Sequence, residues 1–226
     1  MVAYVKRQQP LVMLKSGIIY KQICKITAKL IEVNLSVGQN FPRNKNGVIS
    51  YTGVHDISLA MKDLAYEDIY KKLEETKNYN IKMIDGALIQ LLYDYQHGEL
   101  ISHRLAFFPS PSLESFQNEP ELYEDDEIYA DILAKNIVTF PIRFDFDPKN
   151  FKELEHPKTH VTFGQYKNCR IPVSNPLTPE LFINFILRNF YNTAFTKHTD
   201  DFSVSPSSFN QTITGKEEGV LHLGIY

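Results

Sequence analysis

The stretch IVTFPIRFDFD, residues 137–147, carries the strongest structural signal in the chain, because large apolar side chains alternate in it with polar ones. Successive residues of a strand face opposite sides of a sheet, so this alternation predicts a strand with one buried face. Pro141 has no N–H to donate, which predicts that the strand lies at an edge or turns its proline nitrogen outward. The predicted buried set is Val138, Phe140, Ile142, Phe144 and Phe146, and the opposite face carries Arg143, Asp145 and Asp147.

Further strands are predicted on both sides of this stretch. The runs 160–163 and 168–173 alternate in the same way, and Gly164 provides the turn between them. Upstream, two β-rich runs are joined by the sequence QHG, whose length and glycine predict a hairpin. The hairpin strands are expected at residues 88–95 and 100–108, and a shorter strand at 48–52.

Three helices are predicted from apolar residues at helical spacing. Residues 16–35 carry one apolar stripe, and residues 65–77 combine strong helix formers with a charged outer face. Thr178 is a good N-cap, Pro179 suits the first helical position, and a nearly all-round apolar surface follows. We expect this last helix to pack on the apolar face of the sheet, because that surface would otherwise contact water.

Together these elements predict one α+β domain over residues 1–226, with a mostly antiparallel sheet packed on one face by helices. Two segments are expected to lie outside regular structure. Residues 109–127 combine three prolines with many carboxylates, which predicts an acidic, exposed excursion. Residues 196–215 are polar and loop-like, and a last strand is expected at 219–226.

The composition is that of a compact globular protein. With 226 residues, of which 43% are hydrophobic, the chain can bury a sizeable core without disulfides or metal. Cys24 and Cys169 lack the spacing of a zinc site or a disulfide framework, so we expect buried free thiols in a reducing compartment. No signal peptide and no apolar run of ~20 residues is recognised. We therefore expect a cytoplasmic protein without a membrane partner.

Charge is distributed unevenly along the chain. The formal net charge of −3 does not indicate a broad electrostatic affinity for nucleic acid. Residues 105–134 hold eight carboxylates and no lysine or arginine, so the rest of the chain is net positive. A positive site elsewhere is compatible with this distribution, and the acidic residues 114–127 are a candidate surface for a protein partner.

Polar residues of the predicted strands are expected to meet on one face of the sheet. Residues two apart on a strand point the same way, about 7 Å apart. If the strands that contain Asp145, His160 and Arg170 are neighbours, their polar faces merge into one patch. The patch then comprises Arg143, Asp145, Asp147, His160, Thr162, Asn168 and Arg170, with His156 in the connecting loop.

These side chains suit the cleavage of a phosphodiester. Histidines move protons near neutral pH, and an arginine fork neutralises phosphate oxygens. Asp145 and Asp147 are also candidate ligands of a divalent cation, Mg²⁺ or Mn²⁺, although a site without any cofactor fits equally, and no nucleotide-cofactor motif is found. The candidate catalytic residues are His160, His156, Arg143, Asp145 and Arg170, and the candidate substrate-binding residues are Thr162, Asn168 and Tyr166.

Each of these patterns has a purely structural alternative. Antiparallel sheets commonly solvate one face, so alternation of charge with phenylalanine requires no function. Pro157 interrupts any helix between His156 and His160, so this pair does not match the helical two-histidine zinc arrangement. The His-x-Thr element of two-histidine phosphoesterases occurs once, at His160, and no second copy is found. His103 and Arg104 on the hairpin could join the patch from a fourth strand, although a surface pair is the commoner explanation. We expect His160 to contribute little to the core.

The segment IRFDFDP, followed by HPKTHVTFGQYKNCRIPVSNPLTPELFINFILRNFY, resembles the bacterial family called domain of unknown function 2290, DUF2290. The resemblance runs over residues 128–195, and the stretch SHRLAFFPSP at 102–111 is similar to the same family. This family implies no established activity. An Arg-x-Asp strand followed by His-Pro-x-x-His is also loosely similar to compact toxins of bacterial toxin-antitoxin pairs.

Two functions from different classes are compatible with the sequence. The first is a small nuclease-like phosphodiesterase that cleaves RNA or DNA in a bacterial toxin or antiviral defence setting. The second is a non-catalytic accessory or sensor subunit that binds a protein partner through residues 114–127, or a nucleic-acid end through the polar face. Convergence of the histidine, arginine and aspartate side chains in a concave site favours the enzyme, and a flat, open sheet excludes it.

Overall fold

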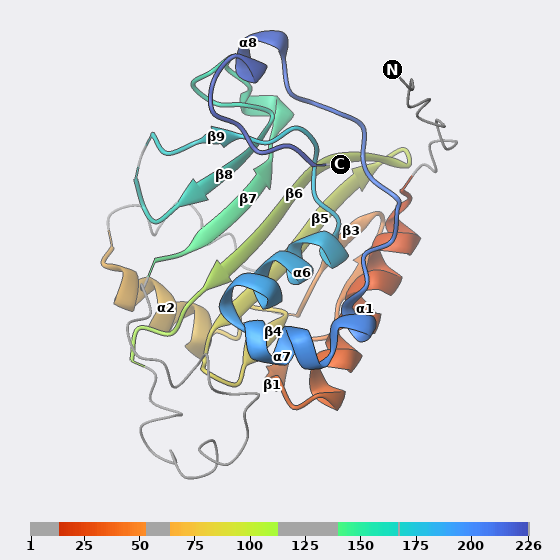
Figure 1. Ribbon diagram of the computed structural model, residues 1–226, viewed down its shortest axis with the longest axis vertical. Helices are drawn as coiled ribbons and strands as arrows, with labels where there is room; N and C mark the ends of the chain where they lie inside the picture. The colour runs from red at the N-terminus through yellow and green to blue at the C-terminus, as the bar shows by residue number, and fades with distance from the viewer. Residues whose placement is uncertain (1–13, 53–63, 113–139, 167, 226) are drawn as a thin grey trace, which may run out of the picture.

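The computed structural model describes residues 14–52, 64–112, 140–166 and 168–225. These residues form a single α+β domain around a nine-stranded sheet, in which all pairings between the described strands are antiparallel (Figure 1). The predicted fold class is therefore confirmed. Within the described part of the chain, no helix has the length and apolar character needed to cross a membrane.

The sheet follows the order β1-β4-β5-β6-β7-β8-β9, and β3 pairs with both β5 and β2. Its strands are β1 (Ser36–Gln39), β2 (Arg43–Lys45), β3 (Val48–Ser50), β4 (Ile81–Met83), β5 (Leu88–Gln96), β6 (Glu99–Phe108), β7 (Ile142–Phe146), β8 (Thr159–Phe163) and β9 (Ile171–Pro172). The helices are α1 (Ser16–Glu32), α2 (Tyr66–Glu75), α6 (Pro179–Phe190), α7 (Asn192–Lys197) and α8 (Gly215–Glu218), with 3₁₀ turns η2 (Pro148–Asn150) and η3 (Thr199–Phe202).

The predicted hairpin is confirmed and forms the two longest strands, β5 and β6. Its turn consists of His97 and Gly98, which have φ values of 52° and 87°. A two-residue turn with two positive φ angles matches the right-handed twist of the strands that it joins. Gly98 adopts this conformation without steric cost because it has no Cβ.

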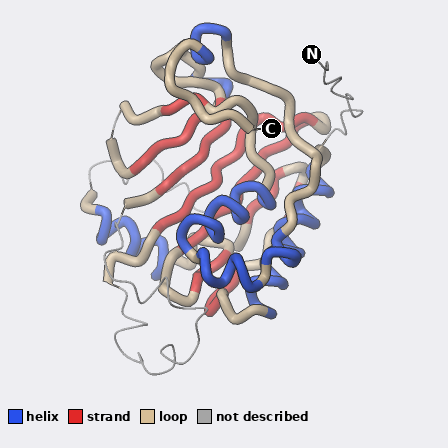
Figure 2. Tube along the Cα trace, in the orientation of Figure 1, coloured by secondary structure: helices blue, strands red, loops and turns tan. Residues whose placement is uncertain are grey.

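One face of the sheet is covered by α1, α6 and α7 (Figure 2). The side chain of Thr178 accepts a hydrogen bond from the Leu181 N–H, 3.2 Å away, so this residue caps α6 as expected. Phe144 of β7 meets the ring of Phe182 edge-on, with centroids 6.0 Å apart, and the ring of Phe185 at 5.7 Å. The prediction that this helix packs on the apolar face of the strand is confirmed.

The opposite face of the sheet is covered by α2 at one end only. Its charged side chains lie toward the other end, which α2 does not cover. The α2 side chains Ile69, Tyr70 and Leu73 form a second apolar cluster with Leu88 of β5 and Phe108 of β6. Strand parity places Leu88 and Phe108 on the face turned away from α6. Further along the strands this same face carries charged side chains instead, and α2 does not extend over them.

The first alternative for Pro141, an edge strand, was wrong, because β7 is an interior strand between β6 and β8. Pro141 lies just before the strand, and its carbonyl accepts a hydrogen bond from the Gly164 N–H at 2.7 Å. A proline outside the hydrogen-bonded ladder needs no donor. Ile142, Phe144 and Phe146 are buried as predicted, and Phe140 is half-buried. Val138 and most of the acidic segment 109–127 lie outside the described residues.

The C-terminal third differs from the expectation in two places. Where residues 196–215 were expected to be loop-like, α7 extends to Lys197, η3 follows, and residues 203–214 are irregular. The strand expected at 219–226 is a single parallel bridge between Val173 and Leu223. Cys24 and Cys169 are both free thiols, but the expectation that they are buried was wrong, because both are only half-buried.

Candidate active site

The register of three adjacent strands places Arg104, Asp145 and His160 in one row. Arg104 of β6 lies opposite Asp145 of β7, and Asp145 lies opposite His160 of β8. Side chains directly opposite on neighbouring antiparallel strands have Cβ atoms about 4.5–5.5 Å apart. The row lies on the face turned away from α1 and α6, because its neighbours Phe144, Leu105 and Val161 face the core.

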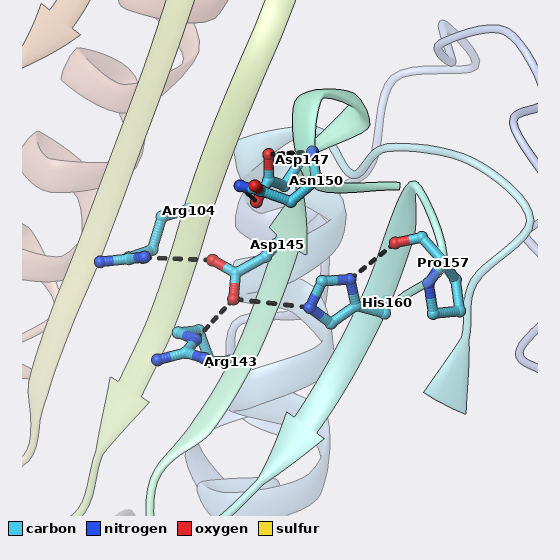
Figure 3. Close-up of polar contacts among 7 residues, drawn as sticks. All are labelled: Arg104, Arg143, Asp145, Asp147, Asn150, Pro157 and His160. Carbon is cyan, nitrogen blue, oxygen red and sulfur yellow. Dashed lines mark hydrogen bonds and ion pairs between the residues drawn. The ribbon is translucent and has the colours of Figure 1, made fainter. Parts of the chain in front are cut away.

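Asp145 is the centre of this row, and only 7% of its surface is exposed. Its Oδ1 accepts a hydrogen bond from the Arg104 Nε at 3.1 Å, and its Oδ2 accepts one from the Arg143 Nε at 2.5 Å (Figure 3). Burial alone would raise the pKa of this carboxyl group, but the two guanidinium groups lower it to about 2. Asp145 is therefore ionised at neutral pH and holds the two arginines in place.

His160 is 2% exposed and is fixed in one orientation. Its Nδ1 lies 2.9 Å from the Pro157 carbonyl oxygen. A carbonyl only accepts hydrogen bonds, so Nδ1 carries the proton, and the Nε2 of the neutral ring has a free lone pair. This Nε2 lies 3.9 Å from Asp145 Oδ2. The expectation that His160 contributes little to the core was wrong, because its ring is buried and bonded to the backbone.

Burial lowers the pKa of His160, although the Asp145 carboxylate partly offsets this effect. The ring is consequently neutral at physiological pH. A neutral imidazole with a fixed tautomer and a free Nε2 is the state required of a general base.

His156 lies beside His160 in the loop that follows η2. The two rings meet edge to face, with centroids 4.7 Å apart. The loop is closed by reciprocal backbone hydrogen bonds between Lys152 and His156, at 3.0 and 2.7 Å. Burial, followed by the charge of Arg170, lowers the pKa of His156. Within the described part of the chain its buried Nδ1 has no hydrogen-bond partner.

A cavity of about 440 Å³ lies over these side chains, and this size falls within the roughly 300–1,000 Å³ range of ligand pockets. It extends from β3 across β5, β6, β7 and β8 to the His156 loop. All five candidate catalytic residues line this cavity. Its charged and polar lining residues are Ser50, Asp94, Ser102, His103, Arg104, Arg143, Asp145, Asp147, His156, His160 and Arg170.

The candidate substrate-binding residues do not line the cavity. Thr162 shares the face of His160 but is buried, with 7% of its surface exposed. Asn168 and Tyr166 lie in the connection between β8 and β9, and the Tyr166 side chain is 78% exposed. The strand β9 begins only at Ile171, so Asn168 and Arg170 precede it. The assignment of these three residues to substrate binding stays a prediction.

Arg104 is the site residue that the sequence interpretation left undecided, because His103 and Arg104 fitted both a fourth strand of the patch and the commoner surface pair. Strand parity separates them: Arg104 binds Asp145, whereas His103 faces the core and is 4% exposed. The His103 Nε2 accepts a hydrogen bond from the Leu177 N–H at 3.1 Å, directly before α6. Burial lowers the pKa of His103 to about 4. The neutral ring of His103 thus connects β6, one of the strands under the cavity, to the backbone directly before α6.

The two candidate metal ligands are both engaged by donors of the protein. Asp145 accepts from Arg104 and Arg143, and Asp147 accepts from the side chain of Asn150 at 2.8 Å (Figure 3). Among the described residues there is no group of three or more histidine, cysteine, aspartate or glutamate side chains that could hold a metal ion. A divalent cation at Asp145 and Asp147 stays a prediction.

The chain belongs to the family described as "Uncharacterized conserved protein (DUF2290)", whose model matches residues 35–225. The resemblance recognised over residues 128–195 is therefore confirmed and extends over nearly the whole chain. No curated protein and no solved structure matches the chain. The looser similarity to compact toxins has no support from these comparisons.

Proposed function

We propose that this protein is a phosphodiesterase that cleaves RNA or DNA, in a bacterial toxin or antiviral defence setting. One observation carries the proposal: a buried neutral histidine with a free Nε2 lies in a nucleotide-sized cavity beside three arginines. The setting is supported only by the loose toxin similarity of the Arg-x-Asp and His-Pro-x-x-His elements. The chemistry is supported by the arrangement of the side chains themselves.

The arginines provide the charge that a phosphodiester requires. Asp145 accepts from the Nε of Arg104 and of Arg143, so these two ion pairs do not use the Nη groups. The side chains of Arg104 and Arg143 are 38% and 40% exposed, and Arg170 lines the same cavity. Guanidinium groups bind phosphate oxygens through paired N–H donors and stabilise the charge that develops during cleavage.

His160 provides the proton acceptor. Its Nδ1–H is held by the Pro157 carbonyl, so its Nε2 is directed toward Asp145 (Figure 3). Both residues line the cavity. Once the ring accepts a proton, the Asp145 carboxylate, 3.9 Å away, stabilises the imidazolium. General base catalysis of this type typically contributes about 10²–10⁴-fold to a rate.

Cleavage of labelled RNA and DNA oligonucleotides tests this proposal. The informative variant is His160→Asn, because the asparagine amide can replace the Nδ1–H donor to Pro157 but has no equivalent of Nε2. Arg188→Ala is a matched control, because Arg188 is exposed on α6, on the opposite side of the sheet. We expect His160→Asn to lose cleavage while it stays folded, with a lower melting temperature because the smaller side chain fills less of the buried space, and Arg188→Ala to retain cleavage.

The alternative, a non-catalytic accessory or sensor subunit, is favoured by the charge balance at Asp145. Its carboxylate already compensates two arginines, and such a cavity can hold a nucleic-acid end without chemistry. Residues 114–127, the candidate surface for a protein partner, lie outside the described residues. Oligonucleotide binding without cleavage by the wild-type protein, under every tested metal condition, would establish this alternative and exclude the enzyme.

A further inference from the structure

The carboxylates near His160 are bonded to other groups of the protein, and this bears on the nucleophile. Asp94, the third carboxylate that lines the cavity, belongs to β5, three strands away from the strand of His160 in the sheet order. Both Asp145 oxygens accept from arginines, and both Asp147 oxygens accept from Asn150. Neither carboxylate is therefore presented as an unpaired group for activating water. His160, by contrast, presents a free Nε2.

These side chains are best suited to a reaction in which the nucleophile is already part of the substrate. The ribose 2′-hydroxyl of RNA lies next to the phosphodiester, so only its proton has to be removed. Attack within one molecule also avoids the entropic cost of positioning a separate water molecule. DNA has no such hydroxyl group.

We infer that the substrate is RNA and that its 2′-hydroxyl is the nucleophile, with His160 as the base that removes its proton. This inference rests on the phosphodiesterase function proposed above and specifies its substrate class. Arg104, Arg143 and Arg170 bind the non-bridging oxygens of the phosphate, whose negative charge increases as the reaction proceeds.

The proton transfers balance through the two neighbouring imidazoles. The 2′-hydroxyl gives its proton to the His160 Nε2, the O2′–P bond forms, and the P–O5′ bond breaks. The leaving O5′ takes its proton from the protonated form of His156, which is a minority species at neutral pH because burial and Arg170 lower the pKa of this ring. The products are a 2′,3′-cyclic phosphate and a 5′-hydroxyl, and transfer of a proton from His160 to His156 or solvent restores the starting state.

The contact between the two rings is compatible with these separate roles. The attacking and leaving oxygens are bound to the same phosphorus, so they are separated by only two P–O bonds. In an in-line displacement these two oxygens lie on opposite sides of the phosphorus, so imidazoles whose centroids are 4.7 Å apart can each contact one of them when the phosphate lies across both rings. His160 is assigned as the base because its tautomer is fixed by Pro157.

Three oligonucleotides of one sequence test the substrate class: RNA, DNA, and RNA with 2′-O-methyl groups at the positions that are cut. Each is incubated with the wild-type full chain in excess EDTA, and the products are identified by mass spectrometry. We expect cleavage of the unmodified RNA alone, with 2′,3′-cyclic phosphate and 5′-hydroxyl ends. Cleavage of DNA or of the methylated RNA, or a requirement for metal, would overturn the inference and leave the phosphodiesterase intact. Failure to cleave all three substrates, with or without Mg²⁺ or Mn²⁺, would overturn both proposals.

An RNA whose leaving O5′ is replaced by sulfur tests the roles of the two histidines. A thiolate leaves without protonation, so this substrate does not need the acid. We expect His156→Asn to cleave normal RNA at least ~10²-fold more slowly than the wild type, and to recover on the sulfur substrate. His160→Asn should stay slow on both substrates. Equal rescue of both variants, or of neither, would refute the assignment. His97→Asn is the control, because His97 lies at the exposed hairpin turn, has a φ of 52° that asparagine tolerates, and does not line the cavity.

Discussion

The buried His103 should make the stability of the protein fall as the pH decreases from about 6.5 to about 4. Burial lowers its pKa from 6.5 to about 4 in the folded state, whereas an unfolded histidine keeps a pKa of about 6.5. Between these values the unfolded chain binds a proton that the folded protein does not bind, so acidification favours unfolding. A difference of about 2.5 pKa units, at 1.36 kcal/mol per unit, lowers the free energy of unfolding by about 3 kcal/mol over this pH range.

Urea unfolding of the wild type and of His103→Gln, followed by circular dichroism across this pH range, measures the effect. A glutamine carbonyl can accept the hydrogen bond from the Leu177 N–H, but glutamine does not titrate. His160, whose pKa is also lowered by burial, contributes a pH dependence of the same sign to both proteins. We therefore compare how the free energy of unfolding changes with pH in the two proteins. Between about pH 6.5 and 4 the wild type should lose about 3 kcal/mol more of this free energy than the variant. Equal losses in the two proteins would refute the account of His103 as a neutral bridge between β6 and the backbone before α6.

Two further variants test the core and the cation cluster. Phe144→Ala should lower the free energy of unfolding by about 3–5 kcal/mol, measured by urea unfolding, because the side chain is 4% exposed and packs against Phe182; a loss below about 1 kcal/mol would contradict this packing. Arg143→Ala should weaken oligonucleotide binding, reduce its salt dependence by about one phosphate contact, and raise the pKa of Asp145, which loses a partner at 2.5 Å. Unchanged affinity and salt dependence, equal to those of the Arg188→Ala control, would show that the cavity does not bind the phosphates.

The parts of the fold that sequence could predict are those determined by local patterns. Alternation assigned Ile142 and Phe144 to the core, and the Thr178-Pro179 pair marked the start of α6. Pro141 misled the prediction because periodicity does not show where a hydrogen-bonded ladder begins. The strong helix formers and charged outer face of residues 65–77 likewise predict a helix, but not the face of the sheet against which it packs.

The candidate site was predictable only where its strands follow one another in the chain. Asp145 and His160 lie on β7 and β8, which are consecutive in sequence and in the sheet, so parity alone placed them together. Arg104 reaches the same carboxylate because β6 pairs with β7 across more than 30 intervening residues, and single-sequence periodicity contains no information about that pairing. Strand parity also predicts which face of the sheet a side chain occupies, but not how deeply that side chain is buried. Thr162 therefore lies on the predicted face but does not line the cavity.

The dependence of kcat/KM for RNA cleavage on pH, in the wild type and in His160→Asn, tests the central claim most directly. This parameter reports the pKa values of the free enzyme, and burial places the pKa of His160 below its usual 6.5. The account predicts that the wild-type kcat/KM rises with pH as His160 loses its proton below about 6.5, and falls again as His156 loses its own. The folded variant should lack the rise and be about 10²–10⁴-fold slower. A folded His160→Asn protein that keeps the wild-type rate and the same acidic limb would contradict the assignment of His160 as the catalytic base.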